Sequence, residues 1–136
     1  MKKVFIDTNV ILRFLLKDHK RQSSVAKKLF VKALQGKIAL LTLPIICAEL
    51  IWVLDSYYQR EKQEIIQKMR SLIVWDGLEI KNKDVLIMAL QIYEYKSVDF
   101  IDAYVAAWMK NNKIDIIYSF DKDFDKIEAI KRLNFE

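Results

Sequence analysis

The sequence predicts an α/β protein in which helices cover both faces of a central, mainly parallel sheet. Short apolar runs rich in β-branched and aromatic residues alternate with longer segments whose apolar residues recur at helical spacing. Parallel strands require such alternation, because a crossover must separate each strand from the next. The 136 residues include only 2 glycines and 1 proline and show no linker or repeat, so we expect a single domain, residues 1–136.

The first predicted elements are a strand and two helices. Lys3–Ile6 is an apolar run expected to be a buried strand, and the turn and cap formers Asp7-Thr8-Asn9 open it onto a helix. From His19 to Gln35, apolar residues occupy one helical arc and basic residues the other, which predicts an amphipathic helix. Gly36 is the expected stop of that helix.

The later elements continue the alternation. Ile38–Leu43 predicts a second strand, and Pro44 stands where a first helical residue is tolerated, so a helix is expected from there to about Tyr57. The remaining predictions are helices over 61–73, from about 82 and from about 99, strands over 78–80 and 114–118, a helical turn near Asp123, and an edge strand within 130–135.

Basic residues are concentrated near the N-terminus. The chain has 23 Lys and Arg against 18 Asp and Glu, a net charge of +5, and residues 1–37 hold ten basic and two acidic side chains. This surplus indicates an anionic partner. The basic helical arc consists of Lys20, Arg21, Lys27, Lys28 and Lys32. It is expected either to contact such a partner or to be an ordinary solvated face.

Several classes of protein are excluded or disfavoured. A single cysteine, Cys47, excludes an internal disulfide and a cysteine-cluster metal site, and a single histidine, His19, makes imidazole zinc sites implausible. No apolar stretch approaches the ~18 residues of a membrane span, and no signal-peptide core is present, so a cytoplasmic protein is expected. If the protein is an enzyme, carboxylates must perform the chemistry.

Two acids directly follow predicted strands. Asp7 ends the first strand, and Asp121 follows the strand over 114–118. Because ligands of open α/β sheets bind outside the carboxyl ends of strands, both acids are placed for chemistry. The alternative is that each only caps the helix that follows.

Glu49 lies within an apolar helical arc, close to Ile46 and Leu50 in projection. A carboxylate on such a face is expected to be desolvated, and it then requires a partner charge, a metal or a crevice. The alternative is a buried ion pair with lysine or arginine.

A second pair of acids begins a later helix. Asp99 and Asp102 are one turn apart; a capping role is open for both, but Asp102 also borders the apolar arc of its helix. Asp125, four residues after Asp121, can face the same site, whereas Asp123 is expected to face solvent.

Converging carboxylates repel one another by about 4 kcal/mol per pair at ~4 Å and an effective dielectric constant of ~20. A hard divalent cation removes that penalty. Oxygen ligands without a histidine or cysteine cluster favour Mg²⁺ or Mn²⁺, the ions that metal-dependent nucleases use.

Taken in order, these motifs resemble those of the PIN-domain nucleases. They are Asp7-Thr8-Asn9, Glu49, Asp99-Phe100-Ile101-Asp102-Ala103 and Ser119-Phe120-Asp121-Lys122-Asp123-Phe124. The length and the run Val10–Leu15 are most similar to VapC-type toxins. The resemblance implies a three-layer PIN-like sandwich and a Mg²⁺- or Mn²⁺-dependent endoribonuclease. It further implies a homodimer, a cognate antitoxin protein that blocks the site, and a structured RNA substrate. The basic helical arc is then expected to contact the phosphates of that RNA.

The resemblance also implies roles for individual residues. Asp7, Glu49, Asp102 and Asp121 are the expected catalytic and metal-binding acids, and the expected auxiliary residues are Asp99, Asp125, Thr8, Asn9 and Ser119. Family members commonly carry threonine where this chain has Ser119, and the hydroxyl is kept.

Two other functions fit part of the sequence. A haloacid-dehalogenase-like phosphatase would use Asp7 as nucleophile, but it needs an acid two residues later, where this chain has Asn9. A non-catalytic RNA- or protein-binding module would use the basic helix for affinity and the acids as helix caps. Glu49 in an apolar arc argues against the second alternative.

Overall fold

The structure is a computed structural model that describes residues 1–134. Its chain divides into two compact units, Met1–Asn82 and the part that begins at Lys83. The predicted α/β class is confirmed, because parallel strands alternate with six α-helices in the described residues.

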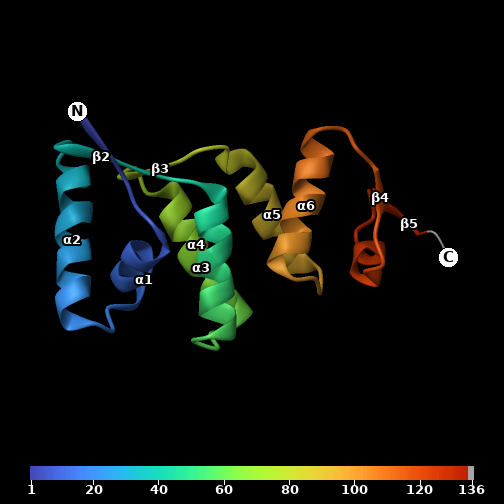
Figure 1. Cartoon of the computed structure of the whole chain (residues 1–136), viewed down its shortest axis with the longest axis horizontal. Helices are drawn as coiled ribbons and strands as arrows, with labels where there is room; N and C mark the ends of the chain where they lie inside the picture. The colour runs from blue at the N-terminus through green and yellow to red at the C-terminus, as the bar shows by residue number, and fades with distance from the viewer. Residues whose placement is uncertain (135–136) are drawn as a thin grey trace. The chain divides into compact units, whose positions relative to one another are not determined.

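The first unit contains a three-stranded parallel sheet in the order β1-β2-β3 (Figure 1). Its elements are β1 (Lys2–Phe5), α1 (Thr8–Leu16), α2 (Lys20–Leu34), β2 (Ile38–Thr42), α3 (Pro44–Ser56), α4 (Lys62–Val74) and β3 (Leu78–Ile80). Val4 is in register with Leu40, and Leu40 with Leu78. The carboxyl ends of β1 and β2 therefore share one edge, where α1 and α3 begin.

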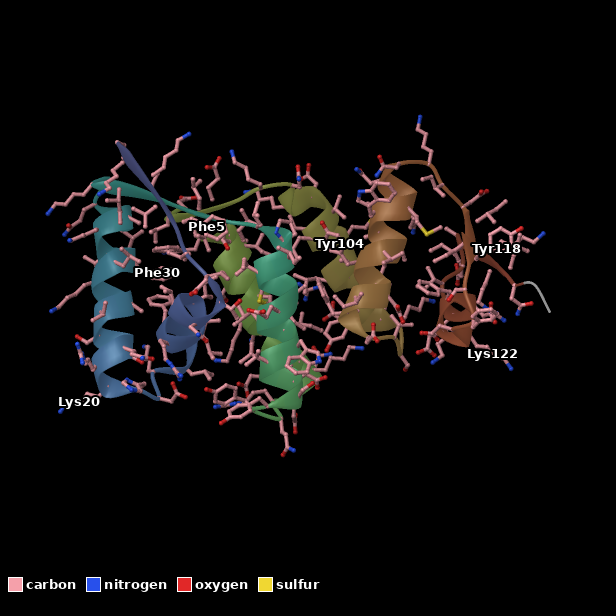
Figure 2. The ribbon with its side chains drawn as sticks, in the orientation of Figure 1. Phe5, Lys20, Phe30, Tyr104, Tyr118 and Lys122 are labelled. Atoms are coloured by element: carbon pink, nitrogen blue, oxygen red, sulfur yellow. The ribbon has the colours of Figure 1, made fainter. Side chains whose placement is uncertain are left out.

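An aromatic cluster forms part of the core of this unit. Phe30 of α2 stacks on Phe14 of α1 with ring centroids 3.9 Å apart, and Trp75 lies 5.0 Å from Phe30. Figure 2 shows Phe30 between α2 and α1. The stacking explains why α1 and α2 pack side by side, since each supplies one ring to the same cluster.

The first strand is less buried than predicted. Phe5 is 53% exposed, although Ile6 directly after the strand is buried. Among the described residues, β1 pairs with β2 alone and is an edge strand of its sheet. An apolar run therefore predicted the strand correctly and its burial wrongly, because burial depends on what lies beside the strand as well as on its residues.

The second unit contains two packed helices and a two-stranded parallel sheet. Its elements are α5 (Lys83–Tyr95), α6 (Phe100–Asn111), β4 (Ile116–Tyr118), the 3-10 helix η1 (Lys122–Lys126) and β5 (Lys131–Leu133). The predicted edge strand within 130–135 corresponds to β5, and Phe135 lies outside the described residues. Within residues 1–134, no helix combines the length and apolar character needed to cross a membrane.

Candidate functional site

Asp7 and Thr8 lie where β1 ends and α1 begins. Asp7 is exposed and caps α1, with its Oδ1 accepting a hydrogen bond from the backbone N–H of Val10 at 3.3 Å. The buried Thr8 donates its hydroxyl to Oε1 of Glu49 in α3. Capping therefore uses Oδ1 of Asp7, and Oδ2 takes no part in this hydrogen bond. The capping role and a ligand role are compatible.

Glu49 differs from its predicted environment. The side chain is exposed, as are Ile45 (72%) and Trp52 (63%), which lie near it on the same side of α3. Within residues 1–134, Glu49 has no lysine or arginine partner, so the alternative of a buried ion pair is wrong. The helix instead buries a neighbouring arc, formed by Cys47, Leu50, Ile51 and Leu54. Apolar character alone did not distinguish the two sides of α3.

Three carboxylates gather in the second unit. Asp102 in the first turn of α6, Asp121 after β4 and Asp123 in η1 each offer an oxygen, and these oxygens lie within 4.8 Å of one another. Asp99 caps α6, and its Oδ1 accepts from the backbone N–H of Asp102 at 2.9 Å. The Oδ2 atom of Asp102 is buried without a hydrogen-bond partner. A buried acceptor without a donor is a position that a cation can fill.

The electrostatics of this cluster favour a positive ligand. Burial, and after it the negative charges of Asp99, Asp121 and Asp123, raise the pKa of Asp102 from 3.8 to about 6. A divalent ion would reverse the effect by compensating the repulsion. The donors are all carboxylate oxygens, which suit Mg²⁺ or Mn²⁺.

The structure assigns different positions to Asp123 and Asp125 from those predicted. Asp123, expected in solvent, is half-buried within the cluster and also pairs with Lys126 at 2.8 Å. Asp125 is held by Arg132 through both oxygens, at 3.1 and 3.2 Å. The prediction for Asp125 assumed α-helical spacing. In a 3-10 helix of three residues per turn, the fourth residue does not return to the same side.

Backbone contacts explain how Asp121 and Asp123 come together. The Oδ1 atom of Asp121 accepts from the backbone N–H of Asp123 at 2.9 Å, and Ser119 Oγ accepts from the backbone N–H of Asp121 at 3.0 Å. Ser119 thus fixes the turn after β4. The spacing Asp-Lys-Asp was the available signal for Asp123, because an Asp that caps a turn commonly binds a backbone N–H two residues later.

The basic residues of α2 form an open cationic face. Lys20, Arg21, Lys27, Lys28 and Lys32 are all exposed, and none of them has an ion-pair partner in the part of the chain that the structure describes. The helix contains no acidic residue. Lys20 is labelled at the start of this helix in Figure 2. The uncompensated charge can attract a polyanion.

A cavity of about 790 Å³ lies beside this face, within the first unit. Its walls come from the start of α1, the turn after it and the first three turns of α2, and they include Asp7, Asn9, Arg13 and Arg21. His19, which the sequence left without a role, caps α2 by accepting from the backbone N–H of Gln22 at 3.1 Å. The cavity depends on the turn between the helices, so no local pattern indicated it.

Comparison with known families provides the deciding observation. The model of the PIN domain matches residues 4–130, a span that contains every acid described above. The chain belongs to the PIN domain family. PIN domains are generally metal-dependent nucleases, and PIN nucleases bind RNA. No curated protein matches the chain. In this PIN domain, two of the acids predicted to bind metal lie in the turns after β1 and β4, and the other two lie in α3 and α6.

Proposed function

We propose that this PIN domain is an endoribonuclease that hydrolyses RNA phosphodiester bonds with Mg²⁺ or Mn²⁺. Its catalytic and metal-holding acids are Asp7, Glu49, Asp102 and Asp121. The observation that carries the proposal is the buried, unpartnered Oδ2 of Asp102 beside Asp121 and Asp123, in a chain of this family.

The chain's own groups fit this chemistry. A divalent ion held by such carboxylates lowers the pKa of a bound water and compensates negative charge on a phosphodiester. Thr8 orients Glu49 and Ser119 holds the turn of Asp121, so both act as positioning residues. Asp99 holds the first turn of α6, Asp125 anchors Arg132, and Asn9 follows Thr8 at the cavity wall. We propose that residues 1–136 act together as one catalytic domain.

We further propose that the protein is the toxin of a toxin–antitoxin pair. The likeness to VapC-type toxins in the length and in the run Val10–Leu15 supports this role. The proposal includes a cytoplasmic location, a homodimer and a cognate antitoxin protein. An adjacent reading frame that encodes a small DNA-binding protein with an apolar tail would support it.

The observations favour the nuclease over the two alternatives. A phosphatase of the haloacid-dehalogenase type needs an acid where Asn9 stands. A binding module explains the capping bonds of Asp7, Asp99 and Asp121, but it gives no reason for an unsatisfied buried oxygen on Asp102.

The direct experiment incubates the purified protein with total RNA in Mg²⁺ and then with a chelator. We expect the protein to cleave RNA in Mg²⁺ and to stop when the chelator is added. The Glu49→Gln protein should not cleave RNA. Asp55→Asn is the matched control, because Asp55 is an exposed acid of the same helix, α3. Equal cleavage by the Glu49→Gln and Asp55→Asn proteins would point to a contaminating nuclease and contradict the proposal.

A further inference from the structure

We propose that the cavity between α1 and α2 is a nucleotide subsite, which holds one nucleoside of the RNA chain while Arg21 binds its phosphate. The inference rests on the proposed ribonuclease function. It adds a position for the substrate beside Asp7, one of the acids proposed to hold the metal.

The cavity has the size and lining of a small-ligand site. Its volume of about 790 Å³ falls in the range of roughly 300–1,000 Å³ typical of such pockets. Val10, Val25, Ala26 and Leu29 provide an apolar wall, and Asn9 and Gln22 provide amide groups. The flat face of a nucleobase can lie against the aliphatic wall, and the amides can bind its polar edge.

Hydrogen bonds hold the side chains on the polar side of the cavity in place without a ligand. Arg13 donates to Gln22 at 2.8 Å and to Asp18 at 3.0 Å, and Tyr58 of the segment after α3 donates to Asp18 at 3.2 Å. Ser23 donates to the backbone carbonyl of Arg13 at 2.8 Å. These bonds hold α2 against α1 at the cavity. Binding of a ligand would therefore cost little conformational entropy.

Arg21 is the cation available to a ligand. Arg13 is already paired with Asp18, whereas Arg21 lines the same cavity without an ion-pair partner in residues 1–134. It is the second residue of α2, where the helix dipole also favours an anion. A guanidinium group can donate two parallel hydrogen bonds to two oxygens of one phosphate.

The charge around the cavity favours RNA over a peptide. Lys28 and Lys32 lie on the same side of α2 as Arg21 and continue its positive charge along the helix, which contains no acidic residue. An RNA backbone carries one negative phosphodiester at every nucleotide and therefore complements a row of cations. A peptide would need an acidic side chain at each of these positions.

The test measures nucleotide binding in a chelator, where cleavage cannot occur. The isotope-labelled full chain is titrated with the four ribonucleoside 5′-monophosphates, and the methyl signals of Val10, Val25 and Leu29 are followed by NMR. We expect saturable shifts of these signals. Losing a charge-assisted hydrogen bond in Arg21→Ala should weaken binding by about tenfold. Lys37→Ala, which removes another exposed cation of the same unit, should leave binding unchanged.

A second variant tests the cavity itself. Val25 is 60% exposed, so Val25→Trp can fill the space without disturbing the core, and we expect it to abolish the nucleotide-induced shifts of the Val10 and Leu29 methyl signals. Equal shifts from inorganic phosphate alone would overturn the proposal, because no base would then be held. Shifts from an acidic apolar peptide but from none of the nucleotides would also overturn it and indicate a peptide groove.

The two proposals fail in different ways. RNA cleavage that requires Asp7, together with no nucleotide binding in the cavity, would overturn the subsite alone. Nucleotide binding that Arg21→Ala weakens supports the subsite, even if Asp7→Ala still cleaves RNA and the proposed mechanism is thereby contradicted.

Discussion

The hydroxyl of Thr8, at the start of α1, donates a hydrogen bond to the carboxylate of Glu49 in the second turn of α3. The bond joins the chain directly after Asp7 to an acid 41 positions further along. Thr8 is buried and Glu49 is exposed, so the bond ties an exposed carboxylate to a hydroxyl held within the unit. Two proposed metal ligands are thus linked through one threonine.

Removing that donor should impair activity more than stability. Thr8→Val keeps the shape of the side chain but frees Glu49, and we expect a loss of about 1 kcal/mol in the free energy of unfolding. The rate of Mg²⁺-dependent RNA cleavage should fall by about tenfold, the smallest loss typical when the hydrogen-bond partner of a metal ligand is removed. Thr8→Ser should restore most of the rate. Cleavage by Thr8→Val at the wild-type rate would show that the bond has no positioning role.

The acidic cluster should give the chelated protein a distinctive pH dependence. The pKa of Asp102 is about 6 in the folded chain and 3.8 ordinarily, so between these pH values the folded state binds more protons than the unfolded state. The free energy of unfolding should therefore fall as pH rises from about 4 to 6 and level off above that window. Asp102→Asn should remove this fall and be more stable at pH 7 by about 1 kcal/mol, because solvent screens this partly exposed group.

Denaturant unfolding at a series of pH values measures this effect. Asp115→Asn is the control, since it removes an exposed acid of the same unit that lies outside the cluster. Its pH profile should match that of the wild-type protein. A wild-type profile without a fall in this window would contradict the raised pKa of Asp102.

Divalent metal should reverse the repulsion and stabilise the fold. At 100 times its dissociation constant, a ligand of the native state alone adds about 2.7 kcal/mol. We expect Mn²⁺ to raise the melting temperature of the wild-type and Asp115→Asn proteins, but not that of Asp121→Asn. An equal rise in all three would indicate binding away from the cluster.

The basic face of α2 should make RNA binding sensitive to salt. Lys27 and Lys28 are exposed and have no ion-pair partner in the described chain. If both bind phosphates of single-stranded RNA, replacing them with alanine should reduce the slope of log affinity against log salt by about 1.4. The measurement uses chelated protein, so that the RNA stays intact. The control is a Lys37→Ala, Lys83→Ala protein, which also loses two exposed cations. If both double variants gave the same slope, the basic face of α2 would be an ordinary solvated surface.

The sequence predicted the elements well because their signals are local. Pro44 begins α3 as expected, and Gly36, with a φ of +73°, follows the end of α2. Asp7, Asp99 and Asp121 each cap the element that follows them. Caps, periodicity and breakers are all properties of a few consecutive residues, and the same residues determine where an element begins and ends.

The environment of individual side chains was harder to predict. Glu49 was expected to be desolvated and is exposed. Apolar residues occupy a wider arc of α3 than the arc that is buried, and Glu49 lies in the part that remains exposed. The partners of Asp125 and Arg13 come from other elements, and a helical projection contains no information about them. The nature of the donors was nevertheless predictable, since a chain with one histidine and one cysteine leaves carboxylates as the available ligands.

We propose that metal-dependent cleavage of RNA requires both Asp7 and Asp102. Single-turnover cleavage by Asp7→Asn and by Asp102→Asn, each of nearly the same shape as the wild-type side chain, tests it most directly. We expect both variants to fold and to lose cleavage by about 100-fold or more, as when one group that stabilises a transition state is removed. Cleavage by either variant at the wild-type rate in Mg²⁺ would contradict this proposal.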